Sequence, residues 1–144
     1  TLFRSYIDVL ASKGCNPLIF AVDDTHFYTT DVFGGFIMVN SKTLDKNEIM
    51  DSIRKGRFYC SQAPEIRQIT LEEGIIHVET SPVSQITFLS DTFYCGNRIC
   101  SKDGELITKG EYIINSKDRV VRIECVDENG KKAWSQLIKV EEFK

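Results

Sequence analysis

The sequence is poor in the residues that metal centres, disulfide scaffolds and membrane spans require. Its 144 residues include only two histidines, three prolines and one tryptophan, and its five cysteines form no Cys-x-x-Cys pair. Without paired cysteines a structural zinc site is not expected. No apolar run approaches the ~18 residues of a membrane-spanning helix, so no membrane association is predicted.

Positive charge is also in short supply. Lysine and arginine number 18 against 21 acidic residues, which gives a formal net charge of -3. Nucleic acid is therefore not an expected partner, because phosphate backbones bind basic surfaces. The content of 42% hydrophobic and 27% charged residues is typical of a globular protein. The length fits one domain, or a small domain with part of another.

The cysteines stand singly in or beside apolar segments, at Cys15, Cys60, Cys95, Cys100 and Cys125. This pattern predicts buried free thiols in a reducing, cytoplasmic compartment. A bridge between Cys95 and Cys100 across a short hairpin is the alternative. The N-terminal residues lack the basic-apolar-small order of a signal peptide, the first residue is not Met, and the chain begins inside a predicted helix. We therefore expect it to be a processed piece or an engineered fragment.

A helix followed by a strand is predicted at the start. Apolar residues recur every three or four positions over residues 2–10, which indicates a helix ending near Gly14. The apolar run 17–22 predicts a strand buried on both faces. Polar residues follow at its carboxyl end, in Asp23–His26, where the ligands of α/β layers lie.

A second strand and helix are predicted before residue 57. Gly34-Gly35 indicates a backbone bend ahead of the apolar strand 36–39. Thr43 or Asp45 can cap the helix that follows, and Gly56 ends it. Residues 1–56 thus have the pattern of αβ elements.

From residue 57 the apolar residues alternate, which is typical of half-buried strands. Turn signals at Glu72-Glu73-Gly74 and at residues 127–130 predict hairpins. About seven short strands with turns every ~8–12 residues describe an antiparallel sandwich. Two domains are therefore predicted, at 1–56 and 57–144, with Trp134 as a core anchor of the sandwich.

The side chains of Asp23, Asp24 and His26 are the strongest candidates for chemistry. Carboxylate and imidazole groups at a strand end can bind one metal ion, and Asp23 could orient the histidine. In the alternative interpretation the two acids cap a turn and His26 is an exposed loop residue. The second histidine, His77, lies in an alternating strand and is expected to face solvent.

Lys55 and Arg57 flank Gly56 and could contact an anion. The simpler interpretation is that both cations complement the carboxyl end of the preceding helix.

The order of three motifs resembles the C-terminal part of the PHP family, the polymerase and histidinol phosphatase metal-dependent phosphoesterases. The motifs are Val22-Asp23-Asp24-Thr25-His26, Gly34-Gly35-Phe36-Ile37-Met38-Val39 and Ile53-Arg54-Lys55-Gly56-Arg57-Phe58-Tyr59-Cys60-Ser61-Gln62-Ala63-Pro64. Ser81-Pro82-Val83 and Ala133-Trp134-Ser135 are similar to a sandwich extension found in some members. The similarity runs from about residue 5 to 140.

The resemblance implies an α+β fold, with terminal αβ elements of a distorted (β/α) barrel in residues 1–56 and an Ig-like β-sandwich in 57–144. It implies that Asp24 and His26 bind divalent zinc, manganese or iron, and that Asp23 orients the histidine. The cluster would activate a water to hydrolyse a phosphorylated small molecule. The family's other ligands, an early His-x-His, a glutamate and further histidines, are missing from this chain.

We therefore expect a C-terminal fragment of a phosphoesterase that is inactive alone and binds metal weakly or not at all. The alternative is a non-catalytic β-sandwich binding module. Barrel elements separated from their partners would expose apolar surface, which predicts self-association or docking of residues 1–56 on the sandwich.

Overall fold

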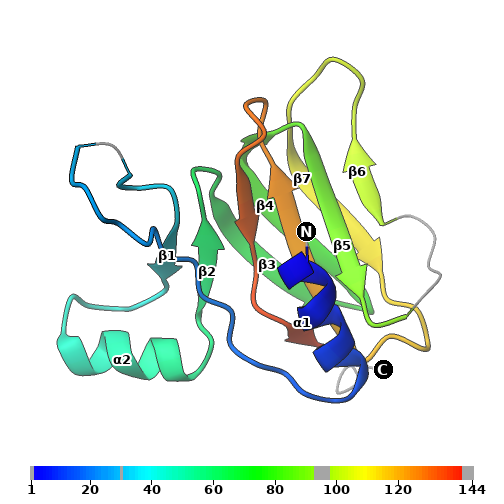
Figure 1. The fold of residues 1–144 in the computed structure, drawn as a ribbon. Coiled ribbons are helices and arrows are strands. Elements are labelled where there is room, and N and C mark those ends of the chain that lie inside the picture. Colours follow the sequence, from blue (N-terminus) through cyan, green and yellow to red (C-terminus); the bar gives the residue numbers. More distant parts are fainter. Residues whose placement is uncertain (1, 30, 93–97, 141–144) are drawn as a thin grey trace.

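Two antiparallel β-sheets form the body of the protein in the computed structural model, which describes residues 2–29, 31–92 and 98–140 (Figure 1). Within these residues there is no closed barrel. The larger sheet follows the order β1-β2-β9-β8-β5-β6, and β10 also pairs with β8. Its strands are β1 (Phe36–Val39), β2 (Phe58–Ser61), β5 (Gln85–Ser90), β6 (Ile99–Ser101), β8 (Val120–Val126), β9 (Lys132–Trp134) and β10 (Ile138–Lys139).

The smaller sheet has the order β3-β4-β7 and packs on the larger one. Its strands are β3 (Ile66–Glu72), β4 (Ile75–Val83) and β7 (Ile107–Ile113). Residues of both sheets contribute alternate side chains to one core, as the alternating pattern predicts. At one end the sheets approach each other, where the Cys100 thiol of β6 donates to the Glu111 carbonyl of β7 at 3.6 Å.

The sequence correctly predicts where the first helix ends and where the second helix begins. In α1 (Leu2–Ser12) the chain leaves through Gly14, whose φ of +80° lies in the left-handed region that favours glycine. The helix α2 (Lys46–Arg54) begins after Asp45, whose carboxylate accepts from the Asn47 and Glu48 N–H groups at 2.9 and 3.2 Å. Asp45 rather than Thr43 is therefore the N-cap.

The two predicted hairpins are also present. Glu73 and Gly74 have φ values of +50° and +78° between β3 and β4, as a tight hairpin turn requires. Between β8 and β9, the Asp127 carboxylate accepts from the Asn129 and Lys131 N–H groups at 2.9 and 2.8 Å. The side chain of Asp127 thus holds that turn.

The strand predicted for residues 17–22 is wrong, because this apolar run lies outside every described helix and strand. Ile19 is buried, but Leu18, Phe20 and Val22 are exposed. The segment crosses from the end of α1 toward β1 (Figure 1) without pairing with any described strand. An apolar run alone does not supply the ladder partner that makes a strand.

The N-terminal region is joined to the sandwich by strand pairing and by α1. Strand β1 pairs antiparallel with β2, with Phe36 opposite Ser61. Helix α1 lies over the outer face of the larger sheet (Figure 1), where its Asp8 carboxylate pairs with Arg122 of β8 at 2.8 Å. The two predicted domains therefore share one sheet.

Trp134 lies on this outer face and not in the core between the sheets, which corrects the prediction for it. Its ring packs in a small cluster with Ile7, Ile19 and Cys60, and its indole N–H donates to Glu124 at 2.9 Å. Because neighbouring residues of a strand point to opposite faces, Ala133 enters the core instead.

The cysteines fit the predicted pattern in part. Cys60 and Cys125 are buried, and burial raises the pKa of their thiols to about 11 and about 12. Both therefore stay protonated near neutral pH. Cys15 is exposed, contrary to the prediction, and Cys100 is half-buried. The alternative bridge to Cys95 lies outside the described residues. Neither described helix combines the length and apolar character needed to cross a membrane.

Candidate functional site

The Asp-His loop (residues 23–35) contains all three predicted site residues and is closed by the first of them. The Asp23 carboxylate accepts from the Phe33 N–H at 2.7 Å and from the Gly35 N–H at 2.5 Å. The Gly35 N–H lowers the pKa of Asp23 most; burial opposes this, and Phe33, Gly34 and Thr25 add smaller lowering contributions. Asp23 thus ties the two ends of the loop together as a carboxylate.

A second aspartate organises the loop's far end. The Asp31 carboxylate accepts from the His26 and Phe27 N–H groups at 2.8 and 2.9 Å, and the Asp31 carbonyl accepts from the Thr25 hydroxyl. Sequence reasoning missed Asp31, because its carboxylate accepts from N–H groups four and five residues earlier, whereas the common aspartate turn motif binds an N–H that follows the aspartate.

With the backbone held in this way, the Asp24 and His26 side chains face solvent. Asp24 has a φ of +56°, in the left-handed region that aspartate tolerates better than most residues. Among the described residues, neither side chain has a hydrogen-bond partner. A carboxylate and an imidazole that are exposed and uncommitted are suitable ligands for zinc, manganese or iron.

Two ligands are fewer than a catalytic metal site requires. The described residues contain no group of three or more histidine, cysteine, aspartate or glutamate side chains that could hold a metal ion. His77 lies on β4 of the smaller sheet, where its Nδ1 is 3.2 Å from the Glu111 carboxylate. It is about one-third exposed and does not join the Asp-His loop. The orienting role predicted for Asp23 stays a prediction.

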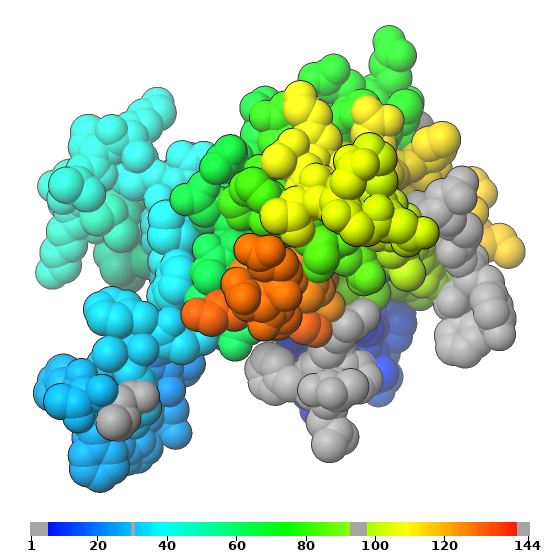
Figure 2. Space-filling view, turned by 90° about the horizontal axis from the view of Figure 1, so that it is seen from above, coloured from blue at the N-terminus to red at the C-terminus, as the bar shows by residue number. Residues whose placement is uncertain are grey.

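Large apolar side chains are exposed along this part of the chain. Relative exposure is 78% for Val22, 68% for Phe27, 91% for Tyr28 and 77% for Phe33. In both views the loop projects away from the sandwich, as the blue segment of Figures 1 and 2. The self-association or docking expected from such exposed apolar surface stays a prediction.

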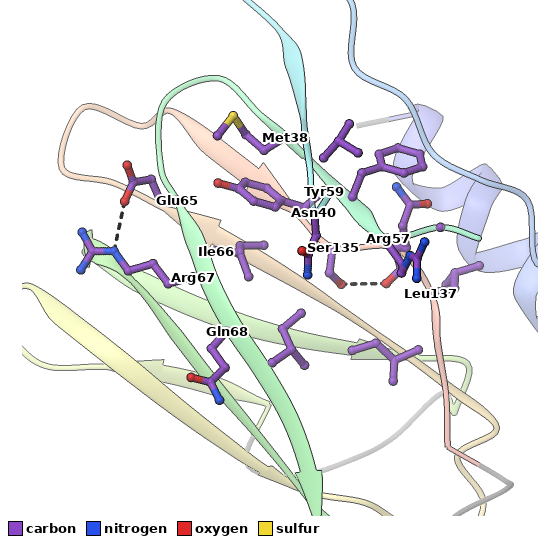
Figure 3. Close-up of a pocket in the computed structure, with 16 residues that line it drawn as sticks. Met38, Asn40, Arg57, Tyr59, Glu65, Ile66, Arg67, Gln68, Ser135 and Leu137 are labelled. Atoms are coloured by element: carbon purple, nitrogen blue, oxygen red, sulfur yellow. Dashed lines mark hydrogen bonds and ion pairs between the residues drawn. The ribbon is translucent and has the colours of Figure 1, made fainter. Parts of the chain in front are cut away.

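A cleft of about 670 Å³ opens at the edge of the sandwich between β2 and β3. Its walls combine apolar and polar side chains, including Met38, Tyr59, Ile66 and Leu137 (Figure 3). Ile69 faces the core side of the small sheet, opposite Val78, yet remains 36% exposed because it lines this opening. No sequence pattern pointed to the cleft, since its residues come from four separate segments.

The arginines at the cleft are paired with neighbouring carboxylates. Arg67 pairs with Glu65 at 3.0 Å, as the dashed line in Figure 3 marks, and Arg57 pairs with Asp51 at 2.8 Å. Lys55 also pairs with Asp51, at 2.9 Å. Both predicted helix-terminal cations therefore bind this carboxylate of α2, which balances only one of their two charges.

A scan against protein-family models and searches of curated proteins and of solved structures found no match to this chain. The resemblance to metal-dependent phosphoesterases therefore stays a prediction from the sequence motifs.

Proposed function

We propose that this chain carries one corner of a divalent-metal site that hydrolyses phosphoesters. Asp24 and His26 would be two of the ligands, and the remaining ligands would come from residues outside this chain. The observation that supports this most is the Asp-His loop itself. Asp23 and Asp31 together hold four of its backbone N–H groups, while the Asp24 and His26 side chains stay exposed.

The exposed apolar residues of the loop support the same proposal. Val22, Phe27, Tyr28 and Phe33 would be buried if further barrel elements packed against the loop. Residues 1–56 would then be the terminal elements of a distorted barrel, and residues 57–144 an Ig-like sandwich attached to it. Alone, the chain would be inactive.

The chemistry follows from the ligand types. A zinc, manganese or iron ion held in part by Asp24 and His26 would supply a water of lowered pKa and would stabilise charge on the phosphoryl oxygens of a small phosphorylated substrate. The protein's own contribution here is to hold a carboxylate and an imidazole two residues apart on a closed loop. Asp23 stays ionised at the base of that loop because its hydrogen bonds hold its pKa below the ordinary value.

The proposal is tested by the kinetics of a longer protein that contains this chain and the remaining ligands. Asp24→Ala with His26→Ala should lower phosphatase activity on p-nitrophenyl phosphate by about 100-fold or more, because two metal ligands are lost. The matched control is Asp103→Ala with His77→Ala, which removes the same side-chain types from exposed or half-exposed positions elsewhere. Equal activity of the two double variants would contradict the proposal.

A second candidate function is a non-catalytic binding module, which the cleft between β2 and β3 favours. Its paired arginines and mixed lining suit a peptide-like ligand. The upstream coding sequence separates the two candidates. A preceding segment with His-x-His and a glutamate supports the phosphoesterase, whereas an open reading frame beginning near Thr1 supports the binding module.

A further inference from the structure

Gln136 makes two hydrogen bonds to a single residue that lies 117 positions earlier in the chain. Its Oε1 accepts from the Ile19 N–H at 2.8 Å, and its Nε2 donates to the Ile19 carbonyl at 2.8 Å. A neighbouring strand would satisfy the same two backbone groups in a sheet. Here a side-chain amide, from the segment between β9 and β10, takes the place of that strand.

Further contacts fix Ile19 on the sandwich. The Cys60 thiol of β2 donates to the Ile19 carbonyl at 3.1 Å. The Ile19 side chain is only 9% exposed and packs in the cluster with Ile7 of α1 and Cys60. The ring of the next residue, Phe20, lies 4.8 Å from that of Phe58 of β2. A segment without regular structure is thus anchored at one point by both backbone and side chain.

Shortly after Ile19 the chain enters the Asp-His loop, whose two ends pack tightly against each other. At Gly35 an added Cβ would lie 3.1 Å from the Val22 carbonyl oxygen, so the two ends of the loop are in close backbone contact. The Asp23 carboxylate joins the same two ends by accepting from the Gly35 N–H. The loop is therefore closed on itself. It joins the larger sheet at two points, through β1, which begins at Phe36, and through the Ile19 contacts.

We propose that Gln136 is a positioning residue: through Ile19 it sets where the Asp-His loop, and with it the Asp24 and His26 ligands, stands on the sandwich. This inference rests on the proposed metal-binding role of Asp24 and His26. The sandwich would then help to position the metal ligands, because Gln136 belongs to the sandwich and the ligands do not.

Only a primary amide of this length suits the position. The group must offer one acceptor to the Ile19 N–H and one donor to the Ile19 carbonyl in the same plane. Leucine has a similar volume and neither function. Glutamate offers two acceptors and sets a negative charge against the carbonyl, until protonation returns an O–H donor.

Amide hydrogen exchange tests the anchor directly. Gln136→Leu and Gln136→Glu should each raise the exchange rate of the Ile19 N–H by about tenfold or more at pH 7, in line with the loss of about 1.4 kcal/mol of hydrogen bonding. The Ile123 N–H in β8 serves as an internal reference. In Gln136→Glu the Ile19 protection should return as the pH falls below about 4, where a glutamate protonates.

Gln68→Leu and Gln68→Glu are the matched controls, because Gln68 is exposed on β3. They make the same chemical changes and should leave Ile19 protected at every pH. Unchanged Ile19 exchange in both Gln136 variants would overturn the inference. So would loss of protection at Ile123 to the same extent, since the effect would then be general unfolding.

Metal affinity of the longer protein distinguishes this inference from the proposed function. Gln136→Leu should weaken zinc binding by about tenfold, because misplaced ligands bind less tightly. If Asp24→Ala with His26→Ala weakens zinc binding and Gln136→Leu does not, the inference alone is overturned. If the double ligand variant binds zinc normally, the proposed function fails and the inference fails with it.

Discussion

The Tyr112 hydroxyl donates a hydrogen bond of 2.7 Å to the Asp118 carboxylate inside the sandwich. Both side chains are essentially buried, and the Tyr112 ring stacks on Phe88 with 5.4 Å between ring centres. The same carboxylate accepts from the Asn115 N–H at 2.8 Å. The pair therefore fixes the turn between β7 and β8 from within the core.

Removing the hydroxyl should destabilise the protein. Tyr112→Phe leaves the buried Asp118 carboxylate with one donor fewer, and we expect a loss of about 1–3 kcal/mol in the free energy of unfolding, measured by urea denaturation. Tyr28→Phe is the control, because Tyr28 is 91% exposed. A loss no larger than that of the control would show that the bond contributes little.

Acid should destabilise the fold through the same carboxylate. Burial raises the pKa of Asp118, but hydrogen bonds from Tyr112, Thr92, Ser90 and Asn115 outweigh burial and lower the pKa. A carboxyl whose pKa is lower in the folded state stabilises the protein above its unfolded pKa, and that stability is lost as the pH falls through the folded value. The melting temperature should therefore decrease as the pH is lowered below about 4. Asp118→Asn should make this decrease smaller. An unchanged dependence of melting temperature on pH would contradict the role of Asp118 in acid destabilisation.

Gly110 of β7 should not tolerate a side chain. An added Cβ would lie 3.2 Å from the Cδ1 and Cγ2 atoms of Ile86, which belongs to the opposite sheet. We expect Gly110→Ala to cost about 1–3 kcal/mol, because a packed core yields little. Adding Ile86→Val, which removes Cδ1, should recover part of this loss. Gly34→Ala, where the nearest atom is 3.6 Å away, is the control.

The ion pair between Asp8 and Arg122 should hold α1 on the larger sheet. Arg122 is 2% exposed and Asp8 is 36% exposed, so Asp8→Ala would leave a buried cation without its carboxylate. The expected cost is below the about 3–5 kcal/mol of a fully buried pair, since water reaches Asp8. Combining Asp8→Ala with Arg122→Met should restore stability. If Arg122→Met does not recover stability lost in Asp8→Ala, the unpaired charge is not the cause of that loss.

The isolated chain should self-associate through the exposed apolar residues of the Asp-His loop. Phe27→Ser with Tyr28→Ser should shift light scattering toward the monomer mass, because these rings are 68% and 91% exposed. Leu106→Ser, at a residue 44% exposed in the sandwich, is the control. A wild-type chain that is already monomeric would contradict this expectation.

The elements that local chemistry dictates could be predicted from the sequence. Gly14 and Asp45 mark helix ends, and Glu73-Gly74 adopts the left-handed backbone of a hairpin turn. Alternation over β4 correctly placed Ile76 and Val78 in the core. These features depend on a few neighbouring residues, so a single sequence contains the necessary information.

Features that depend on distant partners could not be predicted. The run 17–22 has the composition of a strand, but the N–H and carbonyl groups of Ile19 bind the side chain of Gln136, more than a hundred residues away. Trp134 has the size of a core residue, but its register opposite Cys60 and Glu124 turns it to the outer face. The candidate ligands Asp24 and His26 were visible as a motif, whereas Asp31, which arranges their loop, was not.

The metal content of the longer protein is the most direct test of the proposed site. After dialysis against buffer without chelator, the wild-type protein and the control with Asp103→Ala and His77→Ala should retain zinc, manganese or iron by mass spectrometry. The variant with Asp24→Ala and His26→Ala should retain about tenfold less, because metal affinity depends on its ligands. Equal metal content in all three proteins would contradict the account.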